Sequence, residues 1–337
     1  MAVTEFSRTG YLNGANEPTT WHGRGFGITL EANAPFPGLP VCETAGGRVT
    51  TWHEEHPQAI DEAWELDDGS VLVDMRHTDG RLFMRIDSHV SAGYRIWAPY
   101  YGRHLVSADG RSIRSALPNV TPWRWQRLFF AQALPLAAAL QGLEVFHASA
   151  VALRGRVLAF VGAPGAGKTS VAAHLVTLGA KFVTDDVLAI EPGPEGVRAH
   201  PGPARLSIDD AELRRIPPIQ QARVGAQVGR SDKLMLEPTP VEHSLQLAHL
   251  YFLRRAADSS RIHIVEPNES SARALLGSGF LNYLRSPDHL QRHLEVCAAM
   301  SESVRLYDVE VPASCRAREV AATVLAHAEE RSAGVRR

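Results

Sequence analysis

Cysteine is scarce in this chain of 337 residues, which has only Cys42, Cys297 and Cys315. They are too few and too far apart for a disulfide framework or for a zinc site built on cysteine. We therefore expect reduced thiols and a cytoplasmic protein. The first 14 residues also lack the basic-then-apolar pattern of a secretory signal, which favours the same compartment.

Long apolar runs and an excess of one charge are missing too. The most apolar stretch, Leu128–Leu140, has 13 residues and contains Gln132 and Pro135, whereas a helix that spans a membrane needs about 20. The chain has 35 Lys and Arg against 37 Asp and Glu, a formal net charge of −2. This near balance predicts neither nucleic acid nor a membrane as a partner. It leaves homo-oligomerisation open.

The first third of the chain has the pattern of a β-rich domain. Asp-Gly pairs at positions 68–69, 79–80 and 109–110 separate short apolar stretches, and such pairs favour tight hairpin turns. Residues 1–20 show no periodicity and read as a loose arm. The sequence therefore predicts a β-rich N-terminal domain over residues 1–118.

A bridging helix is predicted over residues 119–146. Thr121 can cap it with Pro122 at its first position, Pro135 should kink or split it, and Gly142 suits its end. The remainder, residues 147–330, alternates between strand and helix patterns. The fold class expected for the whole chain is therefore α/β with α+β character.

Five further segments of this second domain have specific predictions. The pattern predicts a strand over residues 155–162, a helix over 168–180 and a second strand over 181–190. SIDDAELRR, at positions 207–215, is predicted to be helical, and Arg254 with Arg255 to lie in a solvated turn.

The stretch GAPGAGKT matches the phosphate-loop pattern G-x-x-x-x-G-K-[ST] and stands between the predicted strand and helix. Glycines let the backbone point its N–H groups at phosphates, the helix adds its positive end, lysine reaches the β- and γ-phosphates and threonine can ligate Mg²⁺. We expect ATP, or another nucleoside triphosphate, and Mg²⁺ as cofactors. The candidate residues are Gly162, Ala163, Pro164, Gly165, Ala166, Gly167, Lys168, Thr169 and Ser170.

Two adjacent carboxylates, Asp185 and Asp186, follow Lys168 by 17 and 18 positions. One helix, a turn and a strand use up that interval, so the acids end or closely follow the next strand. This early position is typical of small-molecule kinases rather than of motor or switch NTPases. One acid can hold Mg²⁺ while the other accepts the proton of an attacking hydroxyl. Because side chains alternate along a strand, both can reach the site only where the strand ends or bulges.

The segment HASAVALRGRVLAFVGAPGAGKTSVAAHLVTLGAKFVTDDVLAI, residues 147–190, resembles the nucleotide site of bacterial HPr kinase/phosphorylase. The resemblance is weaker over residues 147–325. It implies a PEP-carboxykinase-like P-loop domain and a kinase that acts on a serine-type hydroxyl. The matching positions are His147, Lys168, Thr169, Asp185 and Asp186.

In that family one of the paired aspartates is the base at the acceptor hydroxyl, and the acids also organise Mg²⁺. We favour Asp186 as the base and Asp185, with Thr169, on the metal side. Arg205 and Lys233 fall where divergent members carry basic residues and could neutralise phosphate charge or bind the acceptor. The lead-in ALPLAAALQGLEVFHASAV resembles a divergent branch of the family. Ser170 stands where the founding enzymes have a glutamate, so one magnesium-organising carboxylate is absent. The sequence also lacks the basic, glycine-rich segment that supports phosphorolysis in the founding enzymes, so phosphorylase activity is not expected.

The leading hypothesis is an ATP- and Mg²⁺-dependent phosphotransferase whose acceptor is an alcohol, favouring a Ser or Thr hydroxyl of a peptide or protein. One alternative is a small-molecule kinase for an amino acid, a sugar or an antibiotic intermediate. An open site would favour a peptide and a closed pocket beside Asp186 a metabolite. The other alternative is a regulator that binds nucleotide without catalysis.

Overall fold

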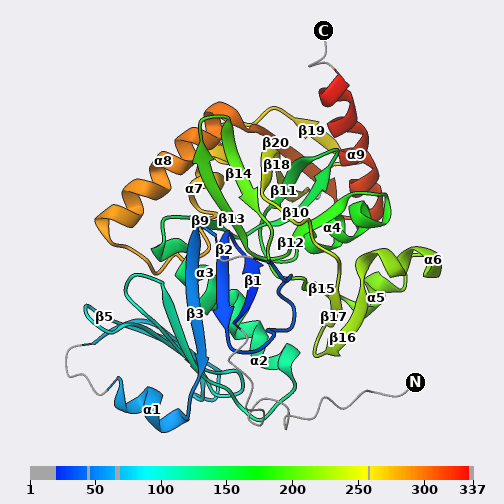
Figure 1. Ribbon diagram of the computed structural model, residues 1–337. Coiled ribbons are helices and arrows are strands. Elements are labelled where there is room, and N and C mark those ends of the chain that lie inside the picture. Colours follow the sequence, from blue (N-terminus) through cyan, green and yellow to red (C-terminus); the bar gives the residue numbers. More distant parts are fainter. Residues whose placement is uncertain (1–19, 44–45, 65–68, 257–258, 334–337) are drawn as a thin grey trace.

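The computed structural model describes residues 20–43, 46–64, 69–256 and 259–333. The fold is mixed α/β, and within the described residues the strands form three sheets of eight, nine and three strands (Figure 1). No helix in these residues has the length and apolar character needed to cross a bilayer. The predicted loose arm lies outside the described residues except for Thr20.

The N-terminal sheet has the strand order β1-β2-β3-β8-β7-β6-β5-β4. Its strands are β1 Trp21–Gly25, β2 Ile28–Ala32, β3 Arg48–Glu54, β4 Ser70–Arg76, β5 Leu82–His89, β6 Gly93–Ala98, β7 Gly102–Val106 and β8 Ser112–Ala116, with α1 Pro57–Glu62 after β3. Strands β4 to β8 form the expected antiparallel meander. Gly80 and Gly110 take positive φ angles of 83° and 70° in its turns, whereas Asp68 of the third Asp-Gly pair lies outside the described residues.

The predicted bridging helix consists of three consecutive segments, α2 Pro122–Leu128, the π-helical η2 Phe129–Ala133 and α3 Leu134–Leu140. Leu134 donates its N–H to the carbonyl of Phe129, five residues back. Pro135, which has no N–H to donate, stands in the first turn of α3, so the π turn splits the helix where the proline predicts a break. Gly142 follows its end at φ 95°.

The nine-stranded sheet carries the second half of the chain, with the order β12-β10-β11-β18-β14-β13-β9, and β20 beside β18 and β19. Its strands are β9 Glu144–Phe146, β10 Ser149–Leu153, β11 Arg156–Val161, β12 Lys181–Thr184, β13 Leu188–Gly193, β14 Gly196–His200, β18 Leu245–Ala256, β19 His263–Val265 and β20 Arg305–Pro312. β11, β18 and β20 run parallel, and antiparallel strands complete the sheet.

Helices cover both faces of this sheet (Figure 1). α4 Lys168–Thr177 and α9 Ala317–Ala333 pack on one face, and α7 Glu269–Leu276 and α8 Pro287–Ser303 on the other. Strand β11 contributes to the hydrophobic core under both layers of helices. Leu158 and Phe160 belong to the core under α4 and α9, whereas the residues that alternate with them belong to the core under α7 and α8. A central strand buried on both faces reads as a continuous apolar run.

Two sequence predictions are wrong in this half. The strand predicted over 181–190 is two strands, because β12 ends at Thr184 and β13 begins at Leu188 on the far side of the sheet. The helix predicted over 207–215 is β15 Leu206–Ile208 followed by the short α5 Asp210–Leu213. β15 joins β17 Leu234–Glu237 and β16 Ala226–Arg230 in the three-stranded sheet, with α6 Pro218–Gln221 and η3 Ala222–Val224 between β15 and β16. In both cases pairing with distant strands overrode the local pattern.

Candidate active site

The topology brings three segments to one edge of the nine-stranded sheet. β10 runs antiparallel to both β11 and β12, so β11 and β12 point the same way and end at the same edge. The phosphate loop follows β11, and the paired aspartates follow β12. β10 begins at that edge with Ser149, two residues after His147.

The phosphate loop has the backbone that its glycines predict. Gly162, Gly165 and Gly167 have φ angles of 154°, 79° and 103°, which L side chains rarely adopt. A Cβ on Gly162 would lie 2.5 Å from the carbonyl oxygen of Leu253. Gly167 caps α4 without a side-chain hydrogen bond, so the N–H groups of the first turn remain available to an anion. The loop residues Ala163, Pro164 and Gly165 are exposed.

Lys168 begins α4 with a side chain that is only 6% exposed. Its ammonium group donates a 2.8 Å hydrogen bond to the carbonyl of Gly162, across the loop. Burial lowers the pKa of Lys168, against the opposing charges of Asp186 and Asp185. The positive group is thus folded against the loop that a phosphate would fill.

Asp185 is held by three donors from three elements. Its Oδ1 accepts from Thr169 at 2.8 Å and from Ser149 at 2.7 Å, and its Oδ2 accepts from the Ser207 N–H at 3.1 Å. Burial nevertheless raises the pKa of Asp185 to about 7, and the Asp186 carboxylate adds to this rise. Crowding a second negative charge beside a desolvated carboxylate disfavours its ionised form, so this group is suited to a cationic neighbour.

Asp186 occupies a strained turn. Its φ angle is 62°, and Val187 donates its N–H to the Asp185 carbonyl at 2.8 Å, two residues back. A non-glycine residue in this conformation is uncommon, and aspartate and asparagine are among the residues that tolerate it best. The turn lets two successive carboxylates leave the strand in different directions. Asp185 accepts a hydrogen bond from Thr169 in α4, whereas Asp186 is exposed, and both line a pocket.

His147 lies at the same edge, where its ring stacks on Phe280 at 5.8 Å between centroids. Burial lowers the pKa of His147, and the charge of Lys168 lowers it further, against Asp186. The imidazole is therefore neutral near pH 7 and can accept or donate one hydrogen bond, but it does not supply a fixed charge.

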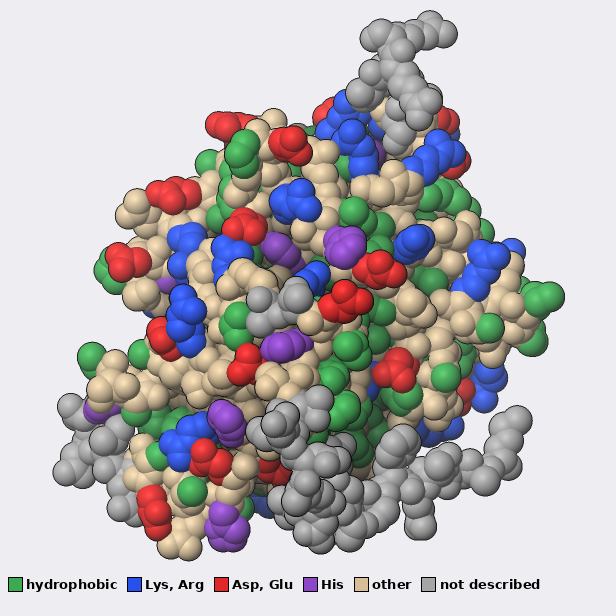
Figure 2. Space-filling view, in the orientation of Figure 1, with side chains coloured by type: hydrophobic (Ala, Val, Ile, Leu, Met, Phe, Trp, Pro, Cys, Tyr) green, Lys and Arg blue, Asp and Glu red, His purple; other side chains and the backbone are tan. Residues whose placement is uncertain are grey.

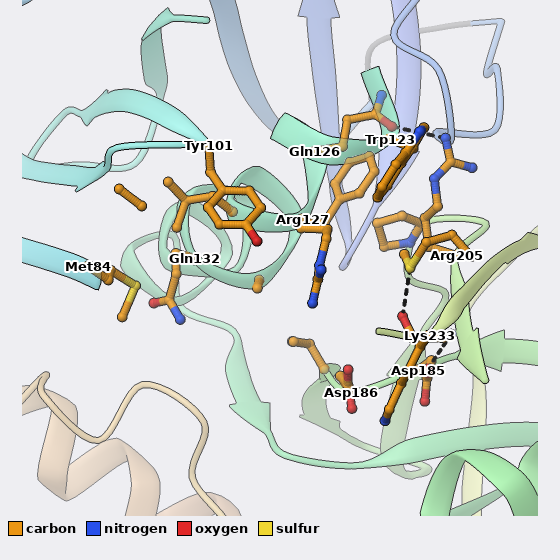
Figure 3. A pocket seen from close by; sticks show the side chains of 18 of the residues that line it. Met84, Tyr101, Trp123, Gln126, Arg127, Gln132, Asp185, Asp186, Arg205 and Lys233 are labelled. Carbon is orange, nitrogen blue, oxygen red and sulfur yellow. Dashed lines mark hydrogen bonds between the residues drawn. The ribbon is translucent and has the colours of Figure 1, made fainter. Parts of the chain in front are cut away.

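A pocket of about 430 Å³ opens beside the acid pair (Figure 3). Its other walls come from β4, β5, the β6–β7 turn, α2 and η2, and also from β15, β17 and the turn between β16 and β17. The N-terminal sheet, the bridging helix and the three-stranded sheet therefore complete it. The lining residues used below are Met75, Phe83, Met84, Tyr101, Trp123, Arg127, Phe130, Asp185, Asp186, Arg205, Ser207, Asp232, Lys233 and Met235. The acids therefore stand between the phosphate loop and a cavity of the size that binds small ligands.

Arg205 and Lys233 both line this pocket but differ in their partners. The Arg205 guanidinium donates to Glu237 at 2.6 Å and to Gln126 at 3.0 Å. Among the residues that the structure describes, the Lys233 ammonium has neither a hydrogen bond nor an ion pair. It points toward the acid pair in Figure 3, and its charge lowers the pKa of Lys168. The Arg205 guanidinium is therefore already paired, whereas the Lys233 ammonium is unpaired within the described part of the chain.

Sequence reasoning missed Ser149, Ser207 and the pocket walls. Ser149 and Ser207 are distant in sequence from the acid that they hold, and only strand pairing brings them to it. The solvated turn predicted for Arg254 and Arg255 is wrong, because both lie in β18. The Arg255 guanidinium lies 3.5 Å from where a Cβ on Gly167 would stand. Ser170, the third residue of α4, is partly buried.

Thr169 and Asp185 carry the kinds of oxygen atom that bind magnesium in proteins. Among the described residues, no cluster of three or more His, Cys, Asp or Glu could hold a metal by itself. Asp185 and Thr169 nevertheless place a carboxylate and a hydroxyl oxygen 2.8 Å apart next to the loop. Mg²⁺ is commonly held by one or two protein oxygens together with substrate phosphates, which is what this pair could offer.

The chain is thus a mixed α/β protein in which a glycine-rich loop with the phosphate-loop pattern lies at the same sheet edge as two aspartates. No family model matches the chain, and no curated protein matches its sequence. Among solved structures, the chain is similar to the Hpr(Ser) kinase/phosphatase from Coxiella burnetii, with 8% identity and a TM-score of 0.31 over 56% of this chain and 99% of that one. A likeness at this level identifies neither the fold family nor the activity.

Proposed function

We propose that the protein transfers the γ-phosphoryl group of ATP to an alcohol. The observation that carries this proposal is the position of Asp186. It follows β12 at the sheet edge where the glycine-rich loop also lies, and it lines a pocket with room for an acceptor. A protein that only binds nucleotide needs no such pocket. The proposed acceptor is a Ser or Thr hydroxyl of a peptide or protein.

The proposed mechanism assigns one task to each side chain. The loop N–H groups and Lys168 bind the β- and γ-phosphates, and Asp185 with Thr169 would hold Mg²⁺. Magnesium, when bound, neutralises charge on the phosphates. Asp186 accepts the proton of the acceptor hydroxyl while the oxygen of that hydroxyl forms a bond to the γ-phosphorus. The bond from that phosphorus to the bridging oxygen breaks, and ADP leaves.

A small-molecule kinase is the second candidate, and the pocket itself favours it. A volume of about 430 Å³ falls within the range of small-ligand sites, about 300–1,000 Å³. A peptide could place only the hydroxyl-bearing residue and its neighbour in such a space.

Mass spectrometry tests the proposal directly. The full chain is incubated with Mg-ATP and candidate peptides, proteins and hydroxyl metabolites, and each acceptor is examined for a phosphate adduct. We expect an adduct that requires both nucleotide and Lys168. Tight nucleotide binding with no transfer to any acceptor would support the non-catalytic regulator instead.

A further inference from the structure

The pocket beside the acid pair is polar where the two aspartates line it and largely apolar on the walls that face them. Six of the residues that line it carry large apolar or aromatic surfaces, from β4, β5, the β6–β7 turn, α2 and η2. They are Met75, Phe83, Met84, Tyr101, Trp123 and Phe130. Met75 and Phe83 remain 47% and 42% exposed. Exposed apolar side chains that gather in a concave site next to reactive groups mark ligand binding rather than core packing.

The two arginines that line the pocket are already paired with acidic side chains, so they offer little unpaired charge to an acceptor. Arg127 donates to Ser231 at 2.9 Å and lies 3.6 Å from Asp232. Arg205 is paired with Glu237. Lys233 has no such partner in the described part of the chain, but it points toward the acids, where the transferred phosphoryl group would lie (Figure 3). Apolar contact, not charge, is therefore what this wall offers to the body of an acceptor.

Methionine is concentrated here. Of the five methionines in the chain, Met75, Met84 and Met235 line the pocket. A methionine side chain is unbranched and polarisable, so it adapts to partners of different shape and contacts aromatic rings favourably. The wall should accept aromatic groups as well as long aliphatic ones.

We propose that this pocket is the acceptor subsite, and that it selects alcohols with a bulky apolar group next to the reacting hydroxyl. The inference rests on the proposed phosphotransfer and adds the acceptor's chemical class. The hydroxyl lies at Asp186, and the apolar group packs against Met84, Tyr101 and Phe130. The N-terminal sheet and the bridging helix thus determine which alcohol is phosphorylated, while the phosphate-loop edge carries out the transfer.

The test measures phosphate transfer from Mg-ATP by the full chain to two acceptor sets. One set is peptides with a single Ser whose neighbours are Gly, Asp, Lys, Leu, Met, Phe or Trp. The other is free alcohols in matched pairs, such as phenylalaninol and alaninol. We expect kcat/KM to be at least about tenfold higher with the apolar neighbour. Phosphorylation of the peptide set identifies a peptide acceptor, and phosphorylation of the free alcohols identifies a metabolite acceptor. Equal rates, or a preference for charged neighbours, would overturn the inference.

Two double variants link any preference to the wall. Met75→Ser with Phe83→Ser removes exposed apolar surface from the pocket. Leu290→Ser with Leu294→Ser removes residues that are 48% and 57% exposed on α8 and do not line the pocket. The first variant should raise KM for the apolar acceptor about tenfold and leave ATP affinity unchanged, which also shows that it folds. The second should match the wild type.

The two proposals fail in different ways. If the wild type phosphorylates no acceptor, the proposed function is refuted. If it phosphorylates alcohols without regard to their neighbours, or if both double variants behave alike, only the acceptor subsite is refuted.

Discussion

Replacing Asp186 with asparagine removes the proposed base while keeping its turn. Asparagine tolerates the φ angle of 62° about as well as aspartate, so the free energy of unfolding should change by less than about 0.5 kcal/mol. A positioned general base contributes about 10²–10⁴-fold to a rate, which corresponds to about 2.7–5.5 kcal/mol of activation free energy. We therefore expect kcat to fall by that factor while the Kd for Mg-ATP changes little.

The assay compares kcat, the Kd for ATP and the melting temperature of three variants. Asp232→Asn is the matched control, because Asp232 also lines the pocket but accepts a hydrogen bond from Ser231 at 2.6 Å and lies 3.6 Å from Arg127. Its kcat should remain close to that of the wild type. Asp186→Ala should lose activity and also about 1 kcal/mol of stability, because alanine disfavours positive φ. Transfer by Asp186→Asn at the wild-type rate would refute the assignment of the base, and an equal loss in Asp232→Asn would show that pocket charge, not proton transfer, matters.

Three further predictions concern the loop and the core. Lys168→Met should raise the Kd for ATP by about 10- to 100-fold, because a hydrogen bond from a charged group is worth about 1.5–3 kcal/mol. Fluorescence titration measures this Kd, and an unchanged value would show that Lys168 does not bind the nucleotide. Gly162→Ala should destabilise more than Gly165→Ala in urea unfolding, since only the former places a Cβ 2.5 Å from the Leu253 carbonyl, while both have positive φ; equal losses would contradict the loop geometry. Burial lowers the pKa of His104 to about 3, so between pH 6.5 and 3 only the unfolded chain binds its proton. The free energy of unfolding should therefore fall by about 1.4 kcal/mol per pH unit below 6.5, and His104→Gln should lack this part of the slope in urea titrations at pH 7, 6 and 5.

Local patterns predicted much of the structure because neighbouring residues determine them. The phosphate loop stands between β11 and α4, as its strand and helix context predicts. The Asp79-Gly80 and Asp109-Gly110 pairs lie in hairpin turns, and the aspartate pair directly follows β12. Each of these features depends on positive φ, on alternation or on helix capping within a few residues.

The same reasoning failed where distant partners decide the conformation. The pattern of residues 181–190 predicts one strand, yet Asp186 takes a left-handed turn and the following strand, β13, pairs with β9. Nothing near Asp185 in the sequence indicates that Ser149 and Ser207 donate to it. Those contacts require strands to pair across the fold, and no local propensity encodes that pairing.

The sequence alone determined that a phosphate-loop pattern and an early pair of carboxylates are present, because both are short motifs that are defined by residue type and spacing. Only the tertiary structure decided that the two carboxylates have different surroundings. It also decided that Met75, Phe83 and Tyr101 line the same pocket as these carboxylates. These three residues come from a separate sheet, about a hundred residues earlier in the chain. Its position depends on a hydrophobic core that joins the N-terminal sheet to Val145, Val187 and Ala189, and burial of that shared apolar surface is a property of the folded chain as a whole.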